Sequence, residues 1–91
     1  MQKSCRLFKV SGRVQGVWYR KSTQKQAEAK GVSGWAVNLA DGGVEVCLAG
    51  PEEAVAEVAD WLAQGPEMAR VDLVEELPAP DAFPEQGFTT G

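Results

Sequence analysis

Strand and helix patterns follow one another along this chain in an order that few folds can accommodate. Alternating apolar and polar residues predict four strands, at residues 5–10, 33–38, 44–49 and 69–77. Helical periodicity covers residues 19–30 and 51–64, so the predicted order is βαββαβ. We therefore expect an α/β (α+β) two-layer sandwich of the ferredoxin-like type, with two helices on one face of an antiparallel sheet of four or five strands.

The chain length and the element boundaries set the domain organisation. The 91 residues suffice for one compact core, so we expect residues 1–91 to form a single domain. Pro51 stands at the first position of the second helix and Gly65 ends it. The buried face of the first helix is predicted to consist of Tyr19, Thr23 and Ala27. Residues 78–91 form a proline-containing tail that either ends in a short edge strand or is partly loose.

A glycine-punctuated turn joins the first predicted strand to the first predicted helix. It reads Gly-Arg-Val-Gln-Gly-Val-Trp-Tyr-Arg from Gly12 to Arg20. Successive amides in such a turn can point into one concavity at the positive end of the helix dipole, and Arg20 adds a forked, permanently charged donor. The turn lacks the glycine spacing and the lysine of the common nucleotide-binding loops. It predicts a site for a small anion such as phosphate; the alternative is an ordinary turn followed by a surface arginine.

The charge balance limits the partners of the chain. The formal net charge is −4, which argues against nucleic acid, because binding to a phosphate backbone needs clustered lysine and arginine. Positive charge gathers instead around the turn, at Arg13, Arg20, Lys21 and Lys25. No apolar run approaches the roughly 20 residues that span a membrane, and no apolar signal segment follows Met1. We therefore expect a cytoplasmic protein without nucleic-acid or membrane partners.

The reactive side chains exclude several kinds of catalysis. Histidine is absent, so the chain lacks the commonest general base, the commonest metal ligand and any nucleophile paired with histidine. Cys5 and Cys47 have neither metal-binding nor redox spacing, and we interpret both as strand residues without a chemical role. We expect neither a metal nor a cofactor.

The predicted topology brings a second polar residue to the turn. Two strands joined through a helix run parallel in a sheet, so strands 5–10 and 33–38 are expected to end at the same edge. The turn follows the first of these strands, and Asn38 ends the second. Asn38 is therefore expected close to Arg20, although asparagine before an Asp-Gly turn commonly has only a structural role.

Two segments, taken together, resemble the acylphosphatase family. They read Val-Gln-Gly-Val-Trp-Tyr-Arg from Val14 to Arg20, and Gly-Trp-Ala-Val-Asn-Leu-Ala-Asp-Gly-Gly-Val-Glu-Val from Gly34 to Val46. The similarity extends over about residues 5–77. Two features depart from the family pattern: Trp18 stands where a smaller residue is frequent, and residues 87–91 read Gly-Phe-Thr-Thr-Gly. The indole of Trp18 either narrows the entrance to the site or packs outward.

The resemblance implies an enzyme that hydrolyses the carboxyl-phosphate bond of acyl phosphates, without a metal, to a carboxylate and phosphate. It assigns phosphate binding to Arg20 and orientation of the attacking water to Asn38. The other expected phosphate donors are the loop amides of Gln15, Gly16, Val17, Trp18 and Tyr19. A carboxylate leaves unprotonated, since the pKa of its acid is about 4, so the absence of histidine fits this substrate. Asn38 cannot deprotonate water, and we expect a phosphate oxygen to accept the proton.

Two other functions stay open at this point. The same loop can serve a phosphate-sensing module without turnover, as when this type of domain is built into larger proteins that process carbamoyl phosphate. An RNA-binding domain has a similar order of elements, but neither a basic sheet surface nor its aromatic motif is present. The presence of both Arg20 and Asn38 favours the hydrolase. We expect a monomer whose partners are an acyl phosphate and inorganic phosphate.

Overall fold

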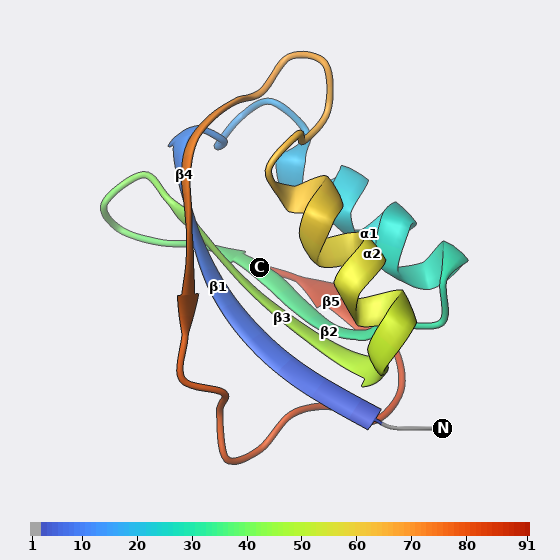
Figure 1. Cartoon of the computed structure of the whole chain (residues 1–91). Helices are drawn as coiled ribbons and strands as arrows, with labels where there is room; N and C mark the ends of the chain where they lie inside the picture. The colour runs from blue at the N-terminus through green and yellow to red at the C-terminus, as the bar shows by residue number, and fades with distance from the viewer. Residues whose placement is uncertain (1–2) are drawn as a thin grey trace.

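The sheet in the computed structural model, which describes residues 3–91, has five strands in the order β4-β1-β3-β2-β5 (Figure 1). The strands are β1 Lys3–Arg13, β2 Ser33–Asn38, β3 Val44–Pro51, β4 Arg70–Leu77 and β5 Phe88–Thr90. The helices are α1 Tyr19–Ala29 and α2 Glu52–Leu62, and both cover the same face of the sheet (Figure 1). This arrangement confirms the predicted two-layer sandwich and its order of elements.

The strand directions make the sheet mixed, where an antiparallel one was expected. β3 pairs antiparallel with both β1 and β2, and β4 pairs antiparallel with β1. β5 instead runs parallel to β2, from Phe88 opposite Gly34 to Thr90 opposite Ala36. Because β1 and β2 both oppose β3, they point the same way and end at the same edge of the sheet, as the topology predicted.

The core lies between the two helices and one face of the sheet. The predicted face of α1 is buried, with Tyr19, Thr23 and Ala27 each at most 1% exposed. Thr23 is polar, but its hydroxyl donates to the carbonyl of Tyr19 at 2.8 Å, so it is satisfied inside the core. The first three strands and one stripe of α2 supply further members of the core: Phe8, Val10, Ala36, Val44, Val46, Leu48, Val55, Val58 and Leu62.

Gly12 allows β1 and β4 to approach closely at the end of β1. Its φ is +129°, and an added Cβ would lie 2.2 Å from the carbonyl oxygen of Arg70. The register between the two strands shifts between Ser11 and Gly12, because Asp72 of β4 has no partner in β1, so β4 carries the extra residue of a bulge here. No larger residue fits this position unless β4 moves, and the turn after β1 therefore starts from a fixed strand end.

α2 begins one residue later than predicted. Pro51 is the last residue of β3 and the N-cap of α2, with φ −56° and ψ 136°, rather than the first helical residue. Glu52 and Glu53 occupy the first turn, where carboxylates stabilise the positive end of the helix dipole.

β5 is the strand that the sequence left uncertain. The segment 78–87 carries the chain from β4, at one edge of the sheet, to β5 at the other (Figure 1). Phe88 is only 4% exposed, and the side-chain amide of Gln24 on α1 donates to its carbonyl at 2.7 Å. The backbone N–H of Gly91 donates to the carbonyl of Ala36 at 3.1 Å. β5 is thus attached to both layers, and it brings Gly91 within hydrogen-bonding reach of Arg20 in α1.

Candidate active site

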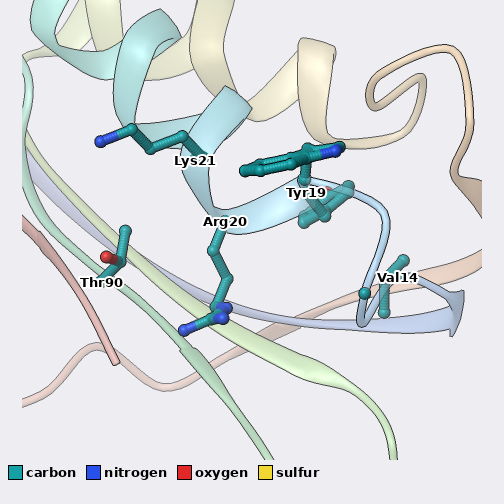
Figure 2. Close-up of a pocket in the computed structure, with 7 residues that line it drawn as sticks. Val14, Tyr19, Arg20, Lys21 and Thr90 are labelled. Carbon is teal, nitrogen blue, oxygen red and sulfur yellow. The ribbon is translucent and has the colours of Figure 1, made fainter.

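A pocket opens at the N-terminal end of α1, beside the turn that the sequence singled out (Figure 2). Its volume is about 330 Å³. The residues that line it are Val14, Gly16, Trp18, Tyr19, Arg20, Lys21 and Thr90. Gly16, Trp18, Tyr19 and Arg20 of the predicted site residues are therefore in the pocket lining, whereas Gln15, Val17 and Asn38 are not.

The backbone of the turn is fixed by buried side chains, while its amides are left without partners. Val17 and Tyr19 are 4% and 1% exposed, so alternate residues anchor the turn in the core. Gly16 and Trp18 have positive φ values of 74° and 66°. Among the residues that the structure describes, no protein acceptor is hydrogen-bonded to the amides of residues 15–19. The turn thus offers unpaired N–H groups on a backbone that is held in place.

Tyr19 connects the turn to α2. Its hydroxyl donates to the carbonyl of Leu62 at 2.7 Å, and its ring centroid lies 5.8 Å from that of Trp61. Burial raises the pKa of Tyr19 above its usual value, so the phenol stays neutral. With its hydroxyl engaged by Leu62, Tyr19 is a structural anchor of the site rather than an acid or base.

Arg20 and Asn38 meet at one backbone oxygen. The Nη1 group of Arg20 donates to the oxygen of Gly91, and the backbone N–H of Asn38 donates to the same oxygen at 3.2 Å. Figure 2 shows the Arg20 side chain reaching from the first turn of α1 toward the sheet. Asn38 is exposed at the end of β2. Residues from α1 and β2 are therefore brought together through the residue that follows β5.

Gln15 ties the turn to the hairpin between β2 and β3. Its side-chain amide donates to the carbonyls of Leu39 and Gly43, at 2.8 and 2.9 Å. Because Leu39 directly follows Asn38, this tie constrains the separation between the turn and the end of β2. The sequence predicted Gln15 only as a backbone donor, since a side-chain contact across 24 positions depends on where the hairpin lies in space.

Three residues of the pocket lining were missing from the predicted site: Val14, Lys21 and Thr90. Lys21 lies in the first turn of α1 and Thr90 in β5. The signal for Lys21 was its place directly after Arg20 in the cluster of positive charge. Thr90 had no such signal, because its place depends on the pairing of β5 with β2.

The charges around the pocket favour an anion. α1 has no acidic residue in its first turn, where Arg20 and Lys21 lie at the positive end of the helix dipole. In the described part of the chain, the ion pairs are Arg6–Glu76, Lys9–Asp41, Lys30–Glu57 and Arg70–Asp72. Neither Arg20 nor Lys21 belongs to these pairs. Two cations at this end of a helix repel its dipole, and a bound anion would relieve that repulsion.

The two cysteines lie on neighbouring strands and outside the pocket lining. The sulfurs of Cys5 in β1 and Cys47 in β3 are 3.9 Å apart. Burial raises the pKa of the Cys47 thiol to about 12, with a smaller effect of its neighbour Cys5. Within residues 3–91, no group of three or more potential ligands that could hold a metal ion is found. Over the same range, no helix combines the length and the apolar character that crossing a membrane requires.

Comparison with known proteins identifies relatives along nearly the whole chain. Residues 6–90 match the acylphosphatase family. An acylphosphatase of Halorhodospira halophila is 51% identical over 82 residues, which cover 90% of this chain and 88% of that relative.

Solved structures agree with the sequence comparison. The structure of an acylphosphatase from Coxiella burnetii has a TM-score of 0.83 and 35% sequence identity, and the match covers 98% of this chain and 93% of that one. The acylphosphatase of Bacillus subtilis has a TM-score of 0.82 and 28% identity, over 99% of both chains. The matched residues include the whole turn, Asn38 and β5. The chain belongs to the acylphosphatase family.

Proposed function

We propose that this chain hydrolyses the carboxyl-phosphate bond of acyl phosphates. Arg20 and the amides of residues 15–19 hold the phosphoryl group, and Asn38 positions the water that attacks it. The observation that carries the proposal is the shared acceptor: Arg20 from α1 and Asn38 from β2 both donate to the oxygen of Gly91. The phosphate-binding side chain and the water-orienting residue are thereby held to one atom.

Phosphate binding is supported by donors that are not used elsewhere. The guanidinium of Arg20 has several N–H groups, and among the described contacts only Nη1 is engaged by Gly91. The remaining N–H groups can bind two phosphate oxygens in a fork. The amides of residues 15–19 are unpaired within the described chain. Together with the dipole of α1, these donors match the charge on the equatorial oxygens of a phosphoryl group in transfer.

The pocket suits a leaving group that needs no proton. None of the lining residues is a histidine or a carboxylic acid, the residues that most often serve as general acids. The hydroxyl of Tyr19 is engaged by Leu62. A carboxylate departs unprotonated because the pKa of its acid is about 4, whereas an alkoxide would need the factor of about 10²–10⁴ that a general acid supplies. The substrate class is therefore an acyl phosphate rather than an ordinary phosphate ester.

Asn38 orients the attacking water without activating it. A carboxamide donates and accepts hydrogen bonds but does not take up a proton at neutral pH. The backbone of Asn38 is fixed by pairing with Val44 and by its bond to Gly91, while the residue itself is exposed to water. The proton of the attacking water passes to a phosphate oxygen of the substrate.

The test is hydrolysis of benzoyl phosphate, followed by ultraviolet absorbance with a chelator present. We expect Arg20→Ala to lower kcat/KM by about 10³-fold or more, as for an arginine on a transferring phosphoryl group. Asn38→Ala should lower kcat by about 10²-fold with a smaller change in KM, because water is positioned for the transition state. Lys25→Ala removes an exposed charge from the same helix, outside the pocket lining, and should keep native activity.

Circular dichroism and calorimetric titration with inorganic phosphate separate the outcomes. A native chain that is folded and binds phosphate but does not turn over benzoyl phosphate overturns the hydrolase and favours the phosphate-sensing module. A loss of activity in Lys25→Ala as large as in Arg20→Ala would assign the effect to the overall charge of the helix and not to Arg20.

A further inference from the structure

Trp18 has a backbone conformation that is unfavourable for its residue type. Its φ is +66° and its ψ 16°, and it is the only non-glycine residue with positive φ among residues 3–91. This conformation brings Cβ too close to the following carbonyl oxygen, a penalty that glycine does not have. Backbone strain of this kind persists where the surroundings impose it, and it is frequent at functional sites.

The surroundings of Trp18 direct its indole outward. Val17 and Tyr19 on either side are buried, whereas the Trp18 side chain is 73% exposed. No side-chain hydrogen bond of Trp18 caps α1. Its carbonyl accepts the N–H of Ser22 at 2.8 Å, a backbone contact that any residue can make. Neither core packing nor helix capping therefore accounts for a tryptophan at this position.

The indole supplies most of the free apolar surface of the pocket. The large apolar side chains in its lining are those of Val14, Trp18 and Tyr19. Val14 and Tyr19 are each 1% exposed, so their surfaces are already used by the core. The remaining lining residues are Gly16, Arg20, Lys21 and Thr90. A ligand bound at Arg20 can thus bury apolar surface mainly against Trp18.

We propose that Trp18 determines which acyl groups the site prefers. The inference rests on the acyl phosphate hydrolysis proposed above. One bridging oxygen joins the acyl group to the phosphoryl group, so a substrate held by Arg20 keeps its acyl group in the same pocket. A flat apolar acyl group stacks on the exposed indole and removes apolar surface from water, whereas an acetyl group is too small to cover the ring. The site favours aromatic and other flat apolar acyl phosphates over acetyl phosphate.

Benzoyl phosphate and acetyl phosphate, which share the reacting bond and differ in the acyl group, test this preference. Trp18→Gly should lower the ratio of their kcat/KM values about tenfold, mainly through the KM for benzoyl phosphate. Trp18→Phe keeps a flat apolar ring and should restore most of the ratio. The matched control is Leu73→Ala, which removes a 52% exposed apolar side chain outside the pocket and should leave both activities unchanged.

Binding of acylphosphonates separates this inference from the hydrolysis on which it rests. Benzoylphosphonate and acetylphosphonate carry an anionic group joined by a carbon-phosphorus bond that is not hydrolysed, and calorimetry measures their affinities. The native chain should bind benzoylphosphonate about tenfold more tightly than acetylphosphonate, and Trp18→Gly should bind the two alike. If this binding pattern is found but no acyl phosphate is hydrolysed, the role of Trp18 in selecting the acyl group is supported and only the proposed hydrolysis is contradicted.

Two results would overturn the role of Trp18. The first is equal affinity of the native chain for both phosphonates. The second is an unchanged ratio of kcat/KM in a Trp18→Gly variant that thermal unfolding shows to be folded. An unchanged ratio in which kcat/KM rises equally for both substrates would mean that the indole obstructs the entrance without selecting the acyl group.

Discussion

The side-chain amide of Gln15 donates to the carbonyl of Leu39 at 2.8 Å and so joins the turn at the pocket to the hairpin that follows β2. A second bond from the same amide group, to Gly43 at 2.9 Å, holds the far side of the hairpin loop. Asn38 is the neighbour of Leu39 in the chain. The position of Asn38 relative to the turn is therefore set by this side chain as well as by the sheet.

Gln15→Ala is expected to weaken both stability and activity. The variant loses two hydrogen bonds, while each carbonyl keeps a backbone donor, Gly42 for Leu39 and Leu39 for Gly43. Each lost bond costs about 0.5–1.5 kcal/mol of unfolding free energy. A looser turn displaces Arg20 from Asn38, so kcat should fall about tenfold or more. Urea unfolding and steady-state kinetics measure the two effects. Gln64→Ala, an exposed glutamine after α2, is the control; equal losses in the two variants would contradict a specific role of the tie.

Because Tyr19 is buried, the free energy of unfolding is expected to depend on pH in the alkaline range. The raised pKa means that the folded protein keeps the phenolic proton to a higher pH than the unfolded chain, whose tyrosine titrates at the ordinary value of about 10. Above that pH the unfolded chain binds fewer protons than the folded one, so the free energy of unfolding decreases. The contribution is fully present below pH 10 and is lost as the pH rises toward the folded pKa.

Tyr19→Phe checks this dependence. The variant loses the bond to Leu62 and should be less stable than native by about 1–2 kcal/mol at pH 8. The variant has no phenol to titrate, so its free energy of unfolding should fall less at alkaline pH than that of the native protein. The difference in unfolding free energy between the two proteins should therefore become smaller as the pH rises from 10 to 11. Denaturant unfolding at a series of pH values measures this gap. A gap that stays constant over that range contradicts the assignment to Tyr19.

Gly12→Ala and Gly42→Ala test the close approach of β1 and β4. Both glycines have positive φ, at 129° and 94°. A Cβ at Gly12 would lie 2.2 Å from the Arg70 oxygen, whereas one at Gly42 meets nothing within 4 Å. Gly42→Ala should cost about 1 kcal/mol through backbone strain, and Gly12→Ala more than about 3 kcal/mol through the added clash. Similar losses in chemical unfolding would show that the steric contact at Gly12 is unimportant.

The two thiols should differ in reactivity. Burial raises the pKa of Cys47 to about 12, so little of its reactive thiolate exists at pH 8, whereas Cys5 is only partly buried. We expect a thiol reagent to label Cys5 first and Cys47 only as fast as the chain opens. Mass spectrometry of the labelled peptides identifies the site, and Cys5→Ser should abolish the fast reaction. Labelling of Cys47 faster than Cys5 in the native protein would contradict this difference in reactivity.

Inorganic phosphate should raise the thermal stability of the protein through Arg20. A ligand at about 100 times its dissociation constant stabilises the folded state by about 2.7 kcal/mol. The midpoint of unfolding should therefore rise with phosphate in the native protein and in Lys25→Ala, but not in Arg20→Ala. Chloride at equal ionic strength controls for general screening. An equal rise in Arg20→Ala would mean that phosphate binds elsewhere.

The parts of the fold that follow from local patterns could be predicted from the sequence. The buried face of α1 at Tyr19, Thr23 and Ala27 is one example, since spacing along a helix fixes which residues share a face. The common edge at which β1 and β2 end is another, because the connection through a helix determines the relative direction of the two strands. Pro51 was placed one position too far into α2, because its fixed φ suits the N-cap as well as the first helical turn.

The parts that depend on contacts between distant segments could not be predicted in this way. Thr90 reaches the pocket only because β5 pairs with β2, and nothing in the three residues of β5 specifies that partner. The side-chain bonds of Gln15 depend equally on where the hairpin lies. The strained conformation of Trp18 had no sequence signal at all, since a bulky residue argues against positive φ.

Because β5 is short, the candidate site is expected to open more easily than the core unfolds. The acceptor shared by Arg20 and Asn38 follows a strand of three residues in which Phe88 alone is buried. Fraying of Thr89, Thr90 and Gly91 alone is expected to release Arg20 while Phe88 keeps its place in the core, and such partial opening requires less free energy than global unfolding. Amide hydrogen exchange at Gly91 is therefore expected to be faster than in β3. We therefore expect catalytic activity to be lost at a temperature below the midpoint of global unfolding.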